Sequence, residues 1–209
     1  GDLYVVDMAG KELTLRASSP SPAETIIDGE GVRGGIICFT GENKDTVIDG
    51  FTITRGSTSS GGGVLCSASS PTLRNCIITG NTASTSGGGV YCFDGDPILE
   101  SCWISNNEAG LSGGGVYLWN SNPKMTSIQI LANEAPLGAG MRCISSSTPR
   151  LAVCKIDGNI ASNRGGGVSL HESSPVLSGC DITNNTSGSD GGGISSEFGS
   201  HPVFASCLI

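Results

Sequence analysis

The sequence predicts an all-β fold, a parallel β-helix (solenoid) of about eight coils, from three observations. Glycine triplets followed by Val or Ile recur along the chain, with one Gly-Ala-Gly variant, and their starts are 26, 26, 25, 27 and 26 residues apart. Prolines recur with the same step. No stretch keeps the helical spacing of apolar residues without crossing a glycine or a proline, which excludes amphipathic helices. The glycine series begins at Gly61, Gly87, Gly113, Gly138, Gly165 and Gly191.

Each repeat contains two apolar strings that are typical of short strands. The first follows the glycines and has the form Val-x-Cys or Val-x-Leu, as at Val64 and Cys66. The second has the form of LRNCII, which begins at Leu73, or of LESCWI, which begins at Leu99. Its Cys-x-Ile part alternates as a strand does, whereas the three-residue step from Leu to Cys requires a bend. We therefore expect two or three short strands per coil, stacked into parallel sheets.

The repeats predict one domain over residues 1–209, because a solenoid grows by adding units. Residues 1–33 are expected to form an N-terminal coil or cap, and residues 34–209 carry the regular repeats. The sequence ends in the middle of a repeat, at FASCLI. An uncapped last unit exposes its core and strand edges, so we expect the natural chain to continue.

Asparagines form a second regular series, each three residues after a core isoleucine. Asparagine tolerates the left-handed backbone conformation that tight corners need. Its side-chain amide can also hydrogen-bond to the equivalent asparagine of the next coil. We therefore predict a structural ladder at one corner, formed by Asn81, Asn107, Asn133, Asn159 and Asn185.

The pairing of Gly-Gly-Gly/Ala-Val/Ile with Ile-x-x-Asn resembles a known family. It is similar to the GGA(I/V/L) and FxxN repeats of the polymorphic outer membrane proteins, with Ile standing where that family has Phe. The stretch TVIDGFTIT, which begins at Thr46, and the later repeats resemble right-handed parallel β-helices of the pectin-lyase-like superfamily. The resemblance covers roughly residues 10–209. It implies a right-handed β-helix and an extracellular or cell-surface location in bacteria.

The nine cysteines fall mostly into two ladders. Leu and Ile replace cysteine in some repeats, which indicates buried, apolar positions where cysteine acts as a small hydrophobe. Two interpretations remain open: free buried thiols, or disulfides across the coil for Cys66/Cys76, Cys92/Cys102 and Cys143/Cys154. The zinc-site spacing CxxC is absent. The longer ladder consists of Cys76, Cys102, Cys154, Cys180 and Cys207.

Charge and motifs limit the classes of function. The net charge of −8 and the lack of a Lys/Arg cluster exclude a nucleic-acid partner. No apolar run is long enough to insert in a membrane. The glycine triplets lack the Lys-Ser/Thr of a phosphate-binding loop. No Ser-His-Asp or two-carboxylate constellation can be assembled from equivalent positions, so we expect no catalytic residue and no cofactor.

Charged residues at equivalent positions have a structural interpretation. Arg74 and Glu100, and likewise Lys155 and Asp181, are expected to pair on the surface between neighbouring coils.

Two aspartates form a candidate calcium site. Asp28 and Asp49 both stand in Ile-Asp-Gly, and if they line adjacent coils they form a candidate calcium site.

One surface feature is a candidate for binding a ligand or partner. If Val90 and Cys92 point inward, Tyr91 and Phe93 point outward, and Tyr117 and Trp119 take the same positions one coil later. Aromatic faces beside carboxylates and amides suit sugar rings or a protein partner. Cross-strand aromatic packing is the alternative interpretation. The flanking residues are Leu65, Arg142, Ile144, Asp94, Asp96, Asn120 and Asn122, and Trp103 is a separate outward aromatic.

These observations favour a non-catalytic, secreted or cell-surface module that serves as a rigid structural or adhesion scaffold. The expected partner is a surface polysaccharide or another protein of a cell-surface assembly. The alternative is a carbohydrate-binding or carbohydrate-active β-helix protein, similar to polysaccharide lyases or hydrolases.

Overall fold

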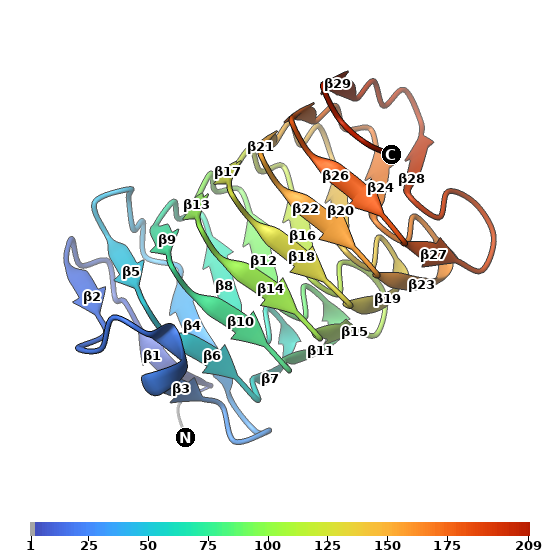
Figure 1. Cartoon of the computed structure of the whole chain (residues 1–209). Coiled ribbons are helices and arrows are strands. Elements are labelled where there is room, and N and C mark those ends of the chain that lie inside the picture. The colour runs from blue at the N-terminus through green and yellow to red at the C-terminus, as the bar shows by residue number, and fades with distance from the viewer. Residues whose placement is uncertain (1–2) are drawn as a thin grey trace.

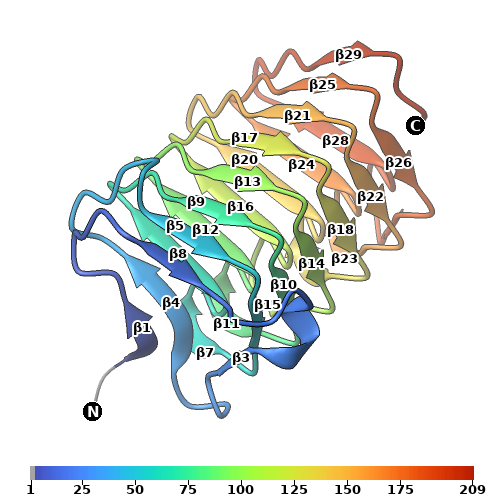
Figure 2. The same cartoon turned by 60° about the vertical axis from the view of Figure 1, so that its left-hand side comes forward.

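The chain winds into a stack of coils, and the computed structural model describes residues 3–209 (Figure 1). Every strand pairs in parallel with the equivalent strand of the next coil, so four sheets run along the stack. The N- and C-terminal ends lie at opposite ends of this rod, as Figures 1 and 2 show. The predicted parallel β-helix of about eight coils is confirmed. The expected two or three strands per coil is wrong, because a full coil contains four.

Sheets A and B each contain eight strands. Sheet A consists of β1 (Tyr4–Asp7), β4 (Gly34–Cys38), β8 (Val64–Ser67), β12 (Val90–Phe93), β16 (Val116–Trp119), β20 (Met141–Ile144), β24 (Val168–His171) and β28 (Ile194–Glu197). Sheet B consists of β2 (Thr14–Arg16), β5 (Val47–Asp49), β9 (Thr72–Arg74), β13 (Ile98–Glu100), β17 (Lys124–Thr126), β21 (Arg150–Ala152), β25 (Val176–Ser178) and β29 (Val203–Ala205).

Sheets C and D complete each coil with seven and six strands. Sheet C consists of β3 (Ile26–Asp28), β6 (Thr52–Thr54), β10 (Ile77–Thr79), β14 (Trp103–Ser105), β18 (Gln129–Leu131), β22 (Lys155–Asp157) and β26 (Asp181–Thr183). Sheet D consists of β7 (Ser57–Ser60), β11 (Thr82–Ser86), β15 (Glu108–Ala109), β19 (Glu134–Leu137), β23 (Ile160–Arg164) and β27 (Thr186–Ser187).

The core is a set of inward columns, one from each strand position. In one coil Val90, Cys92, Leu99 and Ile104 are almost completely buried, and their equivalents in neighbouring coils are buried as well. Burying an aliphatic side chain of this size contributes about 1.5–3 kcal/mol relative to leaving it exposed. The one helical turn among residues 3–209 is a 3-10 helix, Pro22–Glu24, and no helix there is long and apolar enough to cross a membrane.

The corner between sheets B and C explains the three-residue step from Leu to Cys. The residue just before each cysteine adopts a left-handed conformation, with φ of 51° at Asn75 and 53° at Ser101. The left-handed residue breaks the alternation of side chains between the two faces of the strand. As a result, Leu99 on sheet B and Cys102 at the corner both point inward. The predicted bend is confirmed.

At the corner between sheets D and A, successive coils approach so closely that only glycine fits. A Cβ atom at Gly88 would lie 2.4 Å from the backbone oxygen of Glu108 and 2.7 Å from that of Gly114. The first glycine of the triplet is also left-handed, with φ of 68° at Gly87. Any larger residue would force successive coils apart.

The asparagine ladder lies at the corner between sheets C and D. Asn81, Asn107, Asn133 and Asn159 are fully or almost fully buried. The Asn81 Nδ2 donates to Asn107 Oδ1 and to the Ile53 backbone oxygen, both at 3.0 Å. The predicted amide ladder is confirmed. The predicted left-handed conformation of these residues is wrong, since the left-handed residue is the preceding one, such as Asn106 at φ 53°.

All nine cysteines are free thiols, and all except the half-buried Cys207 are buried. Cys38, Cys66 and Cys92 are in register on neighbouring strands of sheet A. Of the two open interpretations, the structure has the free thiols rather than disulfides across the coil. Burial raises the pKa of the Cys143 thiol to about 12, so it stays protonated at ordinary pH.

The surface ion pairs are confirmed in one case and wrong in the other. The Nε of Arg74 lies 3.1 Å from Glu100 Oε2, on neighbouring strands β9 and β13. Lys155 and Asp181 are in register as expected, but the ammonium group of Lys155 lies 3.3 Å from Asp157 on its own strand instead.

The N-terminal part already belongs to the stack, because β1, β2 and β3 join sheets A, B and C. Between β2 and β3 the chain leaves the coil, passes through the 3-10 helix and returns. In Figure 1 this helical turn lies in front of the first strands, beside β3 and β6. The excursion is tied to the coil by Thr52, whose hydroxyl donates to the Pro22 backbone oxygen at 2.9 Å.

Candidate functional site

Four aromatic side chains lie together on the outer face of sheet A. Tyr91 is in register with Tyr117, and Phe93 with Trp119, on strands β12 and β16. The tyrosine rings stack with centroids 5.1 Å apart at an interplanar angle of 10°, whereas Phe93 and Trp119 meet edge to face at 5.5 Å and 84°. Both arrangements are favourable for aromatic pairs. Cross-strand packing therefore accounts for part of this cluster.

The four rings differ in exposure. Trp119 is 41% exposed and Phe93 is half-buried, but Tyr117 is only 7% exposed. Tyr117 is covered from both sides, because Tyr91 on β12 stacks on its ring and Arg142 on β20 is in register with it on the other side. The expectation of four outward, available rings is therefore wrong for Tyr117. The accessible part of the cluster is the exposed Trp119 with the half-buried Phe93 and Tyr91.

Burial also changes the chemistry of the tyrosines. Desolvation raises the pKa of the Tyr117 phenol to about 12, with a further contribution from Tyr91 and an opposing one from Arg142. Desolvation raises the pKa of Tyr91 as well. Both phenols are therefore neutral at ordinary pH and act as hydrogen-bonding groups rather than charges.

Arg142 continues the tyrosine column on β20, in register with Tyr117 and Ser169. Its side chain is only 9% exposed, and its Nη1 donates to the Ser169 hydroxyl. Desolvation lowers the pKa of the guanidinium, and the nearby Glu197 carboxylate opposes that change. Arg142 is thus part of a packed column and offers little surface to a partner.

Asp94 and Asp96 lie at the corner that follows β12 and are exposed. Asp94 accepts a hydrogen bond from the side-chain amide of Asn120 at 2.7 Å. Asp96 accepts one from the backbone N–H of Asn122 at 2.6 Å. These bonds join equivalent corners of neighbouring coils, and they place two carboxylates and two amides beside the half-buried Phe93 and the exposed Trp119.

Asp28 and Asp49 belong to adjacent coils but lie on different sheets, so the expectation that they occupy equivalent positions is wrong. Asp28 lies on β3 of sheet C and Asp49 on β5 of sheet B. Arg55 binds Asp28, with its Nε 2.9 Å from Oδ1, and Arg16 binds Asp49 at 3.0 Å. The Arg55 hydrogen bonds lower the pKa of Asp28. Among residues 3–209 no three His, Cys, Asp or Glu side chains are grouped to hold a metal.

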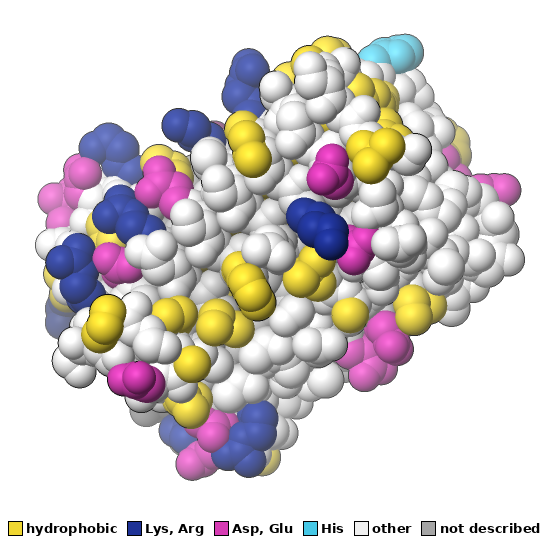
Figure 3. Space-filling view, in the orientation of Figure 1, with side chains coloured by type: hydrophobic (Ala, Val, Ile, Leu, Met, Phe, Trp, Pro, Cys, Tyr) yellow, Lys and Arg dark blue, Asp and Glu magenta, His cyan; other side chains and the backbone are white. Residues whose placement is uncertain are grey.

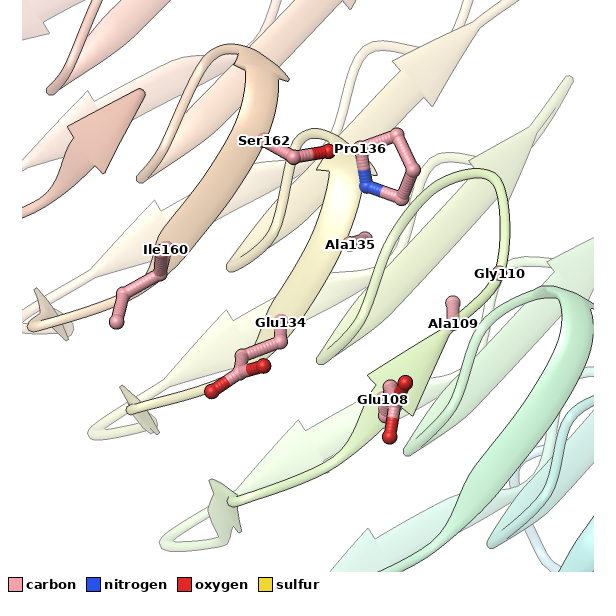
Figure 4. Close-up of a pocket in the computed structure, with 8 residues that line it drawn as sticks. All are labelled: Glu108, Ala109, Gly110, Glu134, Ala135, Pro136, Ile160 and Ser162. Atoms are coloured by element: carbon pink, nitrogen blue, oxygen red, sulfur yellow. The ribbon is translucent and has the colours of Figure 1, made fainter. Parts of the chain in front are cut away.

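A pair of carboxylates was missed by the sequence interpretation. Glu108 on β15 and Glu134 on β19 are in register on sheet D, so the statement that no two carboxylates occupy equivalent positions is wrong. They border an open pocket of about 300 Å³ with Pro136 and Ile160 (Figure 4). The signal was present, because each glutamate directly follows an asparagine of the ladder.

Comparison with known proteins identifies the repeat but not the ligand. A family model described as "right handed beta helix region" matches residues 17–134. A second, described as the Chlamydia polymorphic membrane protein repeat, matches residues 179–197. No curated protein and no solved structure matches the chain.

Proposed function

Because the chain belongs to the right-handed β-helix family, we propose that it is a rigid, non-catalytic scaffold that presents an adhesion surface at a cell surface. Two findings support a scaffold. Inward columns of buried side chains run along the stack, and the asparagine ladder connects consecutive coils from Asn81 to Asn185. The match of residues 179–197 to a polymorphic membrane protein repeat supports the surface location.

The observation that carries adhesion is a partly exposed apolar column on sheet A, with Trp119 as its exposed member. Phe93, Trp119 and Ile144 occupy the same outward position on consecutive strands β12, β16 and β20. Trp119 is 41% exposed, although Tyr117 in the neighbouring column is covered. An exposed apolar patch with a polar rim is typical of a docking surface, and tryptophan and phenylalanine are enriched in such surfaces. Asp94 and Asp96 supply the polar rim here.

The test is binding of the purified protein to arrays of immobilised extracellular proteins and of glycans. A Phe93→Ser/Trp119→Ser double variant is compared with Trp103→Ser, which removes an exposed tryptophan from another sheet. We expect binding to one or more proteins that falls at least tenfold in the double variant and is unchanged in the control. Absence of binding, or an equal loss in both variants, would exclude an adhesion surface at this position.

A second candidate function is a carbohydrate-binding module. The specific observation that favours it is a cleft on another face of the rod, next to Trp103.

A further inference from the structure

The excursion between β2 and β3 forms one wall of a cleft against the outer face of sheet C. Pro20 and Pro22 lie on this wall, and Ile77 on β10 and Trp103 on β14 lie on the floor. Ile77 and Trp103 are in register on neighbouring strands, and Trp103 is 50% exposed. In Figure 3, hydrophobic side chains gather over this face of sheet C, in front of the N-terminal coils. The cleft has a volume of about 320 Å³.

The cleft combines a flat aromatic face with a few hydrogen-bonding groups. Asn75 and Ser101 border it, each at the left-handed corner position before a core cysteine. This conformation places both side chains on the surface, where both are exposed. The Asn75 Nδ2 donates to Asp49 Oδ1 at 3.0 Å, and its own Oδ1 can still accept a hydrogen bond. The Ser101 hydroxyl can donate and accept.

Among residues 3–209, the residues that line the cleft are all uncharged. A neighbouring pocket, which shares Pro20 and Asn75 with the cleft, contains Arg16 and Asp49. There the Nε of Arg16 lies 3.0 Å from Asp49 Oδ2, and the other carboxylate oxygen accepts from Asn75. The two charges therefore compensate each other, and the cleft fits an uncharged ligand better than an ion.

We propose that this cleft binds a ring of a neutral saccharide, stacked on Trp103 and hydrogen-bonded to Asn75 and Ser101. A sugar ring has one apolar C–H face and a rim of hydroxyls, which matches an exposed indole beside an amide and a hydroxyl. The volume lies at the lower end of the range of small-molecule pockets, about 300–1,000 Å³, and so fits one or two rings. The site is independent of the adhesion surface around Phe93 and Trp119, and either can be absent without the other.

A peptide is a poorer occupant. Strand addition is not available, because β10 is hydrogen-bonded to β6 on one side and to β14 on the other. Proline-rich peptides dock in grooves lined by several aromatic residues, whereas Trp103 is the one aromatic residue that lines this cleft.

The experiment uses the indole N–H signals of the two tryptophans in a ¹H–¹⁵N spectrum, because Trp103 and Trp119 lie on different sheets. Trp103→Phe and Trp119→Phe variants assign the two signals. The probes are methyl glycosides of glucose, galactose, mannose and N-acetylglucosamine, their disaccharides, methyl glucuronide and a proline-rich peptide. We expect a neutral saccharide to shift the Trp103 signal saturably and leave the Trp119 signal unchanged.

Variants then test the contacts. Trp103→Ala should weaken binding at least tenfold, Asn75→Ala and Ser101→Ala less, and Trp119→Ala not at all. Because Trp103 points outward, its variants should keep the melting temperature of the parent, and Trp103→Phe should retain part of the affinity. The proposal is overturned if no neutral saccharide shifts the Trp103 signal, if both indole signals move together, or if the glucuronide or the peptide binds more tightly than every neutral saccharide.

Discussion

The side-chain nitrogen of Asn107 lies 3.0 Å from the side-chain oxygen of Asn133, and the backbone N–H of Asn107 donates to the same oxygen at 3.0 Å. One amide oxygen in each coil thus satisfies two donors of the coil before it. This contact repeats from Asn81 to Asn185 and connects the coils at their most buried corner.

The first prediction concerns this ladder. Asn107→Ala removes the acceptor of the Asn81 backbone N–H and the donor to the Ile78 backbone oxygen. Each buried group left without a partner costs about 1–3 kcal/mol, so we expect a loss of roughly 2–5 kcal/mol in the free energy of unfolding. Urea denaturation followed by circular dichroism measures it.

The matched control is Glu108→Gln, on the exposed residue next in the chain. Surface substitutions of this kind usually change stability by less than about 0.5 kcal/mol. If both variants unfold at the same urea concentration as the parent, the ladder contributes no stability.

The second prediction concerns space at the glycine corner. In Gly89→Ala the new Cβ would lie 2.6 Å from the Gly115 backbone oxygen and 2.9 Å from Asn107 Nδ2, and neither atom belongs to a flexible chain end. We expect a loss of about 1–3 kcal/mol or more in the free energy of unfolding. Thermal and urea unfolding of the purified variant test this.

Gly193 offers a control at the equivalent position of the last triplet. The two atoms nearest to a new Cβ at Gly193 would lie 3.6 and 3.9 Å away, which is ordinary van der Waals contact. Gly193→Ala should therefore change stability by about 0.5 kcal/mol or less. An equal cost at the two positions would show that close approach of the coils is not the reason for the triplets.

The third prediction concerns the titration of tyrosines. Burial raises the pKa of all three, to about 12 for Tyr117, whereas an unfolded tyrosine ionises near pH 10. The preference of folded Tyr117 for its neutral form contributes fully to stability below about pH 10. This contribution is lost as the pH rises through about 12, because the phenol of the unfolded chain loses its proton at a lower pH than that of the folded protein. The absorbance of tyrosinate, recorded against pH, should therefore rise at a higher pH in the folded protein than in a denatured sample.

Tyr117→Phe identifies the group. The component that ionises near pH 12 should disappear in this variant, and the component from the other two tyrosines should stay. Ionisation of all three phenols near pH 10 in the folded protein would contradict the burial of Tyr117 between Tyr91 and Arg142.

The fourth prediction concerns the thiols. Only the thiolate reacts rapidly with a disulfide reagent, and eight of the nine cysteines are buried. We expect Cys207 to react first in the native protein, and Cys207→Ser to remove this fast phase. In urea without a reductant all nine thiols should react, whereas three disulfides across the coil would leave only three.

The sequence predicted the repeat and the inward columns correctly because both depend on side-chain periodicity. Cys102 and Ile104, for example, alternate on either side of Trp103 and are buried as expected. Sheet D was missed because its strands carry no such alternation. Strand β11 reads Thr-Ala-Ser-Thr-Ser and has only small or polar residues, so its apolar pattern is too weak to indicate a strand.

The site was predicted less well, since exposure depends on contacts between segments. Tyr117 alternates outward as expected, yet Tyr91 and Arg142, which are in register with it on the neighbouring strands, cover the ring. The Asp28 and Asp49 error had a simpler cause, because their separation is shorter than one period. Counting one full repeat from Asp28 leads to Thr54, which is its partner in the structure. The cleft at Trp103 depends on the excursion between β2 and β3, and no repeat predicts its path.

The parallel pairing of every strand has a mechanical consequence. The hydrogen bonds of all four sheets point along the rod, so tension applied between its two ends acts on them lengthwise and opens one row at a time. Each coil contacts mainly its neighbours, so coils are released singly rather than together. Each released coil of 26 residues adds up to about 90 Å of extended chain. A rod pulled from its ends therefore lengthens in steps and dissipates work at each one.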